Sequence, residues 1–198
     1  MTGDFLGYAR ALGDIDDGGP LPVGRWSPTR RIDIGMAIAA DGTWFHDGVP
    51  ILKPRLVRLF SRILRRDGDE YFLVTPAEKC VVRVADAPFI AVSMAVGWAS
   101  PDEIDPALDG QGPAGNRVLS FSTNVGDQVA AGPGHEIVMT NRPDGSGKAP
   151  YIHVRDGLSA RLGRNIYYDL VDLAEELTID GDAVFAVRSG GMLHRLDA

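Results

Sequence analysis

The sequence lacks most of the features that would assign a function at once. It has a single cysteine, Cys80, so no disulfide can form within the chain and a reducing compartment suits it best. No apolar run approaches the roughly 20 residues that a membrane-spanning helix needs. The N-terminus also lacks the basic and apolar regions of a secretory signal. These absences predict a cytoplasmic protein without a membrane span.

Catalytic and metal-binding motifs are also missing. The four histidines, His46, His135, His153 and His194, show none of the spacings that are typical of zinc sites. The glycine-rich stretch "NVGDQVAAGPGHE" is followed by no helix that would present N–H groups to a phosphate, so it predicts turns and loops. The sequence therefore predicts no catalytic residue, no metal site and no cofactor.

An excess of acidic side chains limits the classes of partner. The chain has 20 Lys and Arg against 27 Asp and Glu, a net charge of −7, which disfavours nucleic acid and anionic membranes. The charge is uneven, because residues 1–90 are neutral overall and residues 91–198 carry the whole excess. Trp26, Trp44 and Trp98 are expected in the core or at a domain interface, since no basic groove accompanies them for stacking bases.

The first half alternates strands and turns around one helix. After an expected short helix at residues 4–13 and a Gly- and Pro-rich linker, residues 31–39 and 43–52 indicate strands with Asp-Gly turns. Pro54 then begins an expected helix. Its apolar positions recur at helical spacing: Leu56, Leu59, Phe60, Ile63 and Leu64. The segment "YFLVTPAEKCVVRV" follows as two strands, with Glu78 and Lys79 in the turn between them.

The second half is richer in strands and has one further helix. Three strand-like segments, "FIAVSMAV", "NRVLSFST" and "HEIVM", precede the loop at residues 141–150. The stretch 164–179 predicts a helix with Ile166, Leu170, Leu173 and Leu177 on one stripe, and a closing hairpin follows it. The domains expected from these patterns are an N-terminal arm at 1–30, a first repeat domain at 31–90, and a β-rich second repeat domain at 91–198.

The two halves repeat one plan of strand, Asp-Gly turn, strand, helix and hairpin. "WFHDGVPI" corresponds to "HVRDGLSA", so Asp47-Gly48 matches Asp156-Gly157, and "GDEYFLV" corresponds to "GDAVFAV". The fold class predicted from this repeat is α+β with duplicated units. An alignment that overlays Leu56 on Leu170 keeps the apolar stripe of the two helices.

The stretch "RLVRLFSRILRR", residues 55–66, is a basic amphipathic segment with no acidic residue. In the same alignment its charges are inverted, so that Arg58 matches Asp172 and Arg62 matches Glu176. Three explanations stay open: complementary charges within the protein or its oligomer, a solvated helix face, and an external acidic ligand.

Several motifs resemble a known family. "DGTWFHDGVPI", "LVRLFSRILRRDGDEYFLVTPAEK" and "ADAPFIAV" in the first half, with "NVGDQV" and "PYIHVRDGLSARLGRNIYYDLV" in the second, are similar to the bacterial family catalogued as domain of unknown function 1285. The resemblance covers about residues 20–196. It implies a duplicated α+β core, a second domain superficially like a pleckstrin-homology fold, a ligand or partner site at the domain interface, and a role in signal transduction. It brings no catalytic residues.

The leading functional hypothesis is a non-enzymatic binding or sensing module for an unknown small anionic ligand or a protein partner. Its site is expected in the groove between the two domains, and the residues expected to line that groove are His46, Arg58, Arg62, Thr75, Glu78, Lys79, Arg155 and Arg161. One alternative is an enzyme of unrecognised class that uses Lys79, Glu78 or a histidine in the cleft. Another is a protein-interaction adaptor that uses the basic segment 55–66, and a homo-oligomer is compatible with all three.

Overall fold

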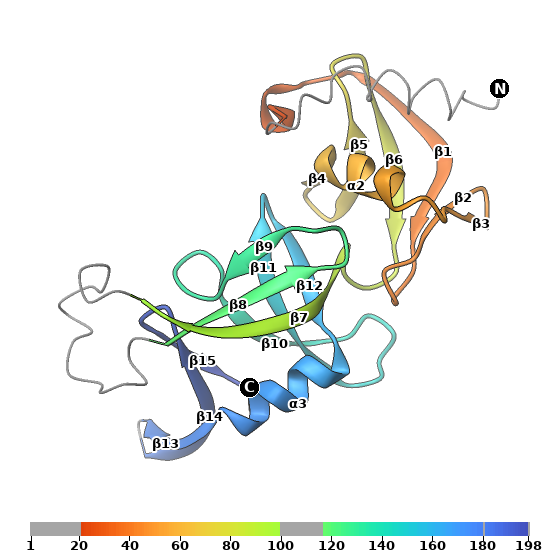
Figure 1. The fold of residues 1–198 in the computed structure, drawn as a ribbon. Helices are drawn as coiled ribbons and strands as arrows, with labels where there is room; N and C mark the ends of the chain where they lie inside the picture. The colour runs from red at the N-terminus through yellow and green to blue at the C-terminus, as the bar shows by residue number, and fades with distance from the viewer. Residues whose placement is uncertain (1–20, 100–116, 180, 198) are drawn as a thin grey trace. The chain divides into compact units, whose positions relative to one another are not determined.

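The structure, a computed structural model, describes residues 21–99, 117–179 and 181–197. This part of the chain is mostly β, with two α-helices, and it forms two compact units. The first unit contains the residues up to Pro88 together with Asp156–Leu158, and the second contains the rest. Figure 1 shows the elements of each unit. The helix expected at residues 4–13 lies outside the described residues.

The first unit is built on a six-stranded sheet in the order β3-β2-β1-β6-β5-β4. A short 3-10 helix, η1 (Val23–Arg25), precedes the sheet. The further elements are β1 (Arg30–Ile38), β2 (Trp44–His46), β3 (Val49–Pro50), α2 (Pro54–Arg62), β4 (Leu64–Asp67), β5 (Glu70–Val74) and β6 (Glu78–Val84). Strands β1 and β6 are parallel and the other neighbours are antiparallel. Helix α2 packs on the sheet through Phe60, whose ring stacks on that of the buried Trp44 at 6.3 Å.

The second unit has a curved six-stranded sheet, a half-barrel, in the order β10-β11-β12-β7-β8-β9, and a three-stranded sheet β13-β14-β15. Its elements are β7 (Phe89–Trp98), β8 (Arg117–Thr123), β9 (Gln128–Ala130), β10 (Ile137–Asn141), β11 (Lys148–Arg155), β12 (Leu158–Leu162), α3 (Arg164–Asp172), β13 (Glu175–Ile179), β14 (Asp182–Ser189) and β15 (Met192–Arg195). Leu119, Phe121 and Ile152 are fully buried in its core. None of the helices in the described ranges is long and apolar enough to cross a membrane.

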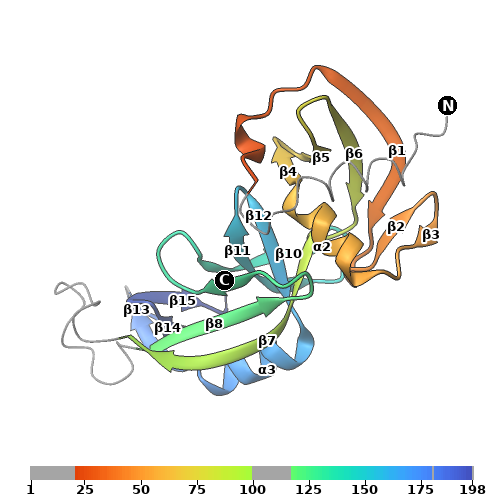
Figure 2. The same cartoon turned by 45° about the horizontal axis from the view of Figure 1, so that its top comes forward.

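The six strands β10–β15 repeat the plan of β1–β6. The Asp-Gly turns correspond closely, because Asp47 and Asp156 have φ values of 48° and 47°, and the glycine after each also has positive φ. Such backbone angles at both positions are typical of tight hairpin turns, which Asp-Gly favours. Strand β10 contacts β15, although the two lie in different sheets and form no ladder like that of β1 with β6, and the Ile137 N–H donates to His194 Nδ1 at 3.1 Å. Strands β7–β9 come between the two repeats in the chain and belong to neither; Figure 2 shows β7 and β8 side by side.

Both predicted helices are too long, and for the same reason. Helix α2 ends at Arg62 rather than near residue 66, and α3 ends at Asp172 rather than at 179. The residues that follow form β4 and β13, which pair with β5 and β14 across the next turn. Each apolar stripe continues beyond the last helical turn, so periodicity alone did not separate the helix from the strand. The available signal was the Asp-Gly pair that follows each predicted helix in the sequence, Asp67-Gly68 and Asp180-Gly181, since a hairpin turn needs a strand before it as well as after it.

When the two helices are matched by their ends in the structure, the inversion of charges predicted from the sequence is largely absent. The two helices are nine residues long, and matching their ends overlays Pro54 on Arg164. Arg58 then corresponds to Tyr168, and Arg62 to Asp172. The alignment that was based on the apolar stripe is therefore shifted by about one helical turn. One pair of opposite charges is left, so the repeat gives little support to charge complementarity between the helices.

Candidate functional site

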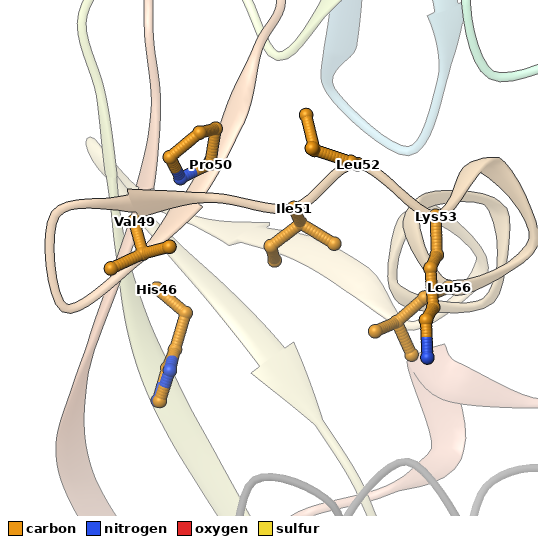
Figure 3. Close-up of a pocket in the computed structure, with 7 residues that line it drawn as sticks. All are labelled: His46, Val49, Pro50, Ile51, Leu52, Lys53 and Leu56. Atoms are coloured by element: carbon orange, nitrogen blue, oxygen red, sulfur yellow. The ribbon is translucent and has the colours of Figure 1, made fainter.

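A pocket of about 320 Å³ lies in the first unit, where the β2–β3 hairpin leads into helix α2. It is lined by His46, Val49, Pro50, Ile51, Leu52, Lys53 and Leu56. Figure 3 shows the side chains of Val49, Ile51 and Leu56 on one side of the connecting segment, while Leu52 points to the other side. The lining is therefore largely apolar, with an imidazole and an ammonium group at its rim.

Strand β1 holds this hairpin in place through an irregular pairing at Gly35. The register of β1 against β6 shifts between Asp33 and Met36, and Gly35 has a φ of 70°. The Asp47 N–H donates to the Gly35 carbonyl at 3.0 Å. A Cβ atom on Gly35 would clash with Asp47 Oδ1, and the positive φ would strain any other side chain, so glycine is favoured beneath the turn that leads to the pocket.

Cations gather beside the pocket, at the start of α2. Lys53 is the N-cap residue and is exposed, Arg55 lies in the first turn and Arg58 in the second. The first turn contains no acidic residue, and no side chain caps its N–H groups. Cations near a helix N-terminus oppose the helix dipole, at a cost of roughly 0.3–1 kcal/mol each. An anion beside Lys53 would relieve this repulsion.

One of the predicted site residues lines this pocket, and two others lie on helix α2 without lining it. His46 lines it, and its Nε2 lies 3.7 Å from Asp47 Oδ2. Arg58 and Arg62 lie on α2, exposed and half-buried respectively. The basic segment itself is divided by the end of the helix. Arg65 and Arg66 lie in β4, where they pair with Asp67 and Asp69 instead of extending a cationic helix face.

Thr75, Glu78 and Lys79 lie together at the β5–β6 hairpin, but not as predicted. Glu78 and Lys79 are the first residues of β6 and not part of the turn, which Thr75 closes by bonding the N–H and C=O of Glu78. Glu78 pairs with Arg30 at 3.0 Å, and Lys79 with Asp67 at 3.3 Å. Cys80, next along β6, is buried in the strand, as the sequence predicted.

Lys79 and Arg31 cover the buried ring of Phe72. Their cationic groups lie 4.4 and 5.4 Å from the ring centroid, and Arg31 also pairs with Glu70. Asp67 accepts hydrogen bonds from Arg65 and Lys79, which hold the pKa of its carboxyl below the usual range. This cluster has the form of a packed sheet surface on which each of the cations has an acidic partner.

Arg155 and Arg161 belong to the strands of the second unit. Arg155 pairs with Asp127 at 3.4 Å, and its guanidinium lies 5.2 Å from the ring centroid of Phe89. Arg161 is half-buried in β12.

Trp44 is a core residue, as expected, whereas Trp98 in β7 is 64% exposed and is not a core residue.

The predicted set missed most of the pocket. Val49, Ile51, Lys53 and Leu56 line it, and His46 alone had been singled out. A signal was present in "VPILKP", residues 49–54. This apolar run follows a tight turn and contains two prolines, which disfavour a central strand and leave its side chains exposed.

Two family models match the chain. Residues 21–87 match the N-terminal domain of DUF1285, a domain of unknown function, and residues 106–196 match the C-terminal domain of the same family. No curated protein matches the chain.

Solved structures of the same family are similar to this chain. A DUF1285 family protein from Silicibacter pomeroyi is 44% identical, with a TM-score of 0.80, over 96% of this chain and 93% of that one. Another, from Shewanella baltica, is 30% identical, with a TM-score of 0.49, over 70% of this chain and 91% of that one. The resemblance seen in the sequence motifs is thereby confirmed, and the chain belongs to the DUF1285 family.

Proposed function

We propose that this protein is a non-enzymatic binding module and that the pocket beside α2 takes a small amphiphilic anion. The observation that carries this proposal is the apolar pocket bordered by Lys53 and by the uncapped, cationic start of α2. Its volume of about 320 Å³ is near the lower end of the range of small-molecule sites, so it suits a small ligand or one end of a longer chain.

The two parts of the site would bind the two parts of such a ligand. Val49, Ile51 and Leu56 offer apolar surface, and Val49 is 65% exposed without a ligand. Covering that surface would stabilise the complex by about 25 cal/mol for each Å² removed from water. Lys53 and Arg55 would hold a carboxylate or phosphate head group by charge-assisted hydrogen bonds. His46, at the far side of the pocket, would add a further polar contact.

A wider role follows from the family resemblance. Signal transduction, a pleckstrin-homology-like second domain and a cytoplasmic location are further parts of this proposal. Their support is that resemblance, the half-barrel sheet of the second unit, and the composition of the chain. The expectation of a site at the domain interface stays a prediction.

The two alternatives raised by the sequence have less support. Two of the groups suggested for catalysis, Glu78 and Lys79, are engaged with Arg30 and Asp67 across the strands. The basic segment suggested for an adaptor is divided between α2 and β4, which leaves Arg55, Arg58 and Arg62 on the helix.

A thermal-shift series would test the proposal. The ligands are straight-chain carboxylates and alkyl monophosphates of increasing length, each tested against the whole chain. A ligand at 100 times its dissociation constant adds about 2.7 kcal/mol, which corresponds to several degrees in Tm for a protein of this size. We expect the shift to grow with chain length and then to level off when the pocket is full.

Two pairs of variants identify the site. Lys53→Ala and Val49→Ser should each reduce the shift. Lys148→Ala changes the net charge equally, and Val138→Ser alters a similarly exposed valine outside the pocket, so both should keep it. The proposal fails if no anion of either class raises Tm, or if Lys53→Ala and Lys148→Ala respond alike.

A further inference from the structure

Among the described residues, strand β7 has one edge without a partner strand over most of its length. Its neighbour β12 pairs with it only from Phe89 to Ala91, where the chain turns away into α3. The pairing with β8 continues on the other side as far as Trp98. From Ser93 to Trp98, therefore, β7 has one strand neighbour among the described residues, and it runs on beyond β12 in Figure 1.

This edge is exposed and apolar. Val92 is 58%, Val96 46% and Trp98 64% exposed, so α3, which packs against β7, does not cover them. Ser93 and Ala95 are exposed as well. The chain has no charged residue or histidine from Ala87 to Pro101. An unpaired strand edge with these properties readily accepts another strand.

Other strand edges of the described structure carry features that discourage such pairing. Strand β3 has two residues, one of them Pro50, and β9 has three. Strand β4 presents Arg65, Arg66 and Asp67, and β13 begins with two glutamates. Charge, proline and shortness are the usual means of protecting an edge, and β7 has none of them over these residues.

We propose that β7 pairs with β7 of a second copy of this chain, antiparallel across a two-fold axis at Val96. In this register Met94 faces Trp98 of the partner subunit and Val96 faces itself, which brings the large apolar side chains together on one face. Ala95 and Gly97 face each other across the axis on the opposite face, where their small size allows close approach. The strand is thus complementary to itself, as an isologous two-fold interface requires.

The second copy is favoured over an unrelated strand by this complementarity. Large side chains meet large ones, small meet small, and no charge is buried or opposed. The contact between Met94 and Trp98 adds a sulfur–aromatic interaction. Five residues a side make a small interface beside the roughly 1,600 Å² of a standard one, so monomer and dimer are expected to interconvert with concentration.

Sedimentation equilibrium of the whole chain tests this proposal. We expect a concentration-dependent dimer for the wild type and a monomer for Val96→Lys under the same conditions, because an edge lysine blocks strand pairing. Val138→Lys is the matched control, since Val138 is 49% exposed in β10, and it should dimerise like the wild type. The proposal is overturned if the wild type stays monomeric at every concentration, or if Val96→Lys dimerises equally well.

Cross-linking tests the register. Paired strands bring opposite Cα atoms to about 4.5–5.5 Å, within the range of a disulfide. Val96→Cys should therefore form a covalent dimer on oxidation and Val138→Cys should not, while the native Cys80 is buried and inert. A dimer that gives no cross-link at position 96 would overturn the two-fold axis proposed here.

Hydrogen exchange distinguishes pairing of the β7 edge with a second copy from coverage of that edge by another part of the same chain. The amides from Ser93 to Trp98 that face the free edge should become protected as concentration rises, and lose this protection in Val96→Lys. Protection that is already complete in dilute solution would mean that the chain covers its own edge, and would overturn the second copy as the occupant. This measurement also shows whether Val96→Lys keeps the native fold.

Discussion

At the scale of single residues, His194 is a buried histidine with a defined tautomer. It is 2% exposed in β15, and its Nδ1 accepts a hydrogen bond from the Ile137 N–H, so the proton of the neutral ring is on Nε2. Burial lowers the pKa of His194 below its ordinary value near 6.5, against the opposing effects of the Ser189 backbone and the Glu136 carboxylate. The ring is therefore neutral in the folded protein at neutral pH.

This lowered pKa predicts a loss of stability in mild acid. The unfolded chain takes up a proton on His194 as the pH falls below about 6.5, and the folded chain does so only at lower pH. The stabilising contribution is therefore present above this pH and is lost as the pH falls toward the folded pKa. The loss amounts to about 1.4 kcal/mol for each unit by which the pKa is lowered.

Denaturant unfolding between about pH 7.5 and pH 5 measures this effect, because the carboxylates titrate below that range. In His194→Asn, Oδ1 replaces Nδ1 as the acceptor for Ile137. This variant should be less stable at neutral pH but should lose less on acidification than the wild type. His153→Gln is the control, and an equal flattening of its pH dependence would count against His194 as the source.

At the scale of elements, Arg65 fastens the segment before β1 to strand β4. Its Nη1 donates to the carbonyls of Val23 and Trp26 at 3.2 and 2.7 Å, and Nε and Nη2 both bond the carboxylate of Asp67. The fixed fork of the guanidinium allows all these bonds at once, which an ammonium group cannot reproduce. The position of η1 thus depends on one side chain that the sequence had placed on a cationic helix.

Arg65→Lys should therefore loosen η1 without unfolding the sheet. We expect faster tryptic cleavage after Arg25, which lies in η1 and is exposed, and faster amide exchange from Val23 to Trp26. Arg66→Lys is the matched control, because Arg66 is more exposed and bonds only within its own hairpin. Equal cleavage rates in the two variants would show that Arg65 does not hold this segment.

At the scale of the whole molecule, pairings between distant strands dominate the topology. Ile32 pairs with Cys80 in the parallel β1–β6 ladder, and Ala160 pairs with Phe89 in the parallel β7–β12 ladder. The chain must lose the entropy of closing these long loops before the contacts between the strands form, and this slows folding. Chains of this kind therefore fold in milliseconds to seconds. We therefore expect slow refolding with no microsecond phase that restores the native signal.

Stopped-flow fluorescence in the variant Trp98→Phe measures this rate. Trp26 and Trp44 remain in this variant, both in the first unit, and Trp44 is 1% exposed and stacked on Phe60, so the emission reports the assembly of that unit. Recovery of the full signal within the mixing time would show that local contacts are enough to form that core. A chain of this length is also expected to populate intermediates, which would appear as additional slow phases.

The local patterns in the sequence determined much of the fold. Asp47-Gly48 and Asp156-Gly157 predicted two tight turns, and both have the positive φ values that such turns need. The duplicated plan was visible because each unit must build its own core from the same spacing of strands and helix. Cys80 was correctly placed as a small apolar residue in a strand, since nothing in its surroundings suggested reactivity.

Tertiary structure decided what local patterns leave open. Residues 64–67 form a strand and not a helical turn because β5 offers them a hydrogen-bonded partner, which outweighs a weak helical preference. The pocket likewise lies between a hairpin and the start of a helix, and the pattern of apolar residues in the sequence does not identify its exposed Val49 as a pocket residue. Within the described ranges, β7 extends beyond its pairing with β12 because β12 ends early, which only the pairing of strands can show. Composition and periodicity reflect interactions between residues that are near in the sequence. Binding sites and strand edges depend instead on whether segments that are distant in the sequence come into contact.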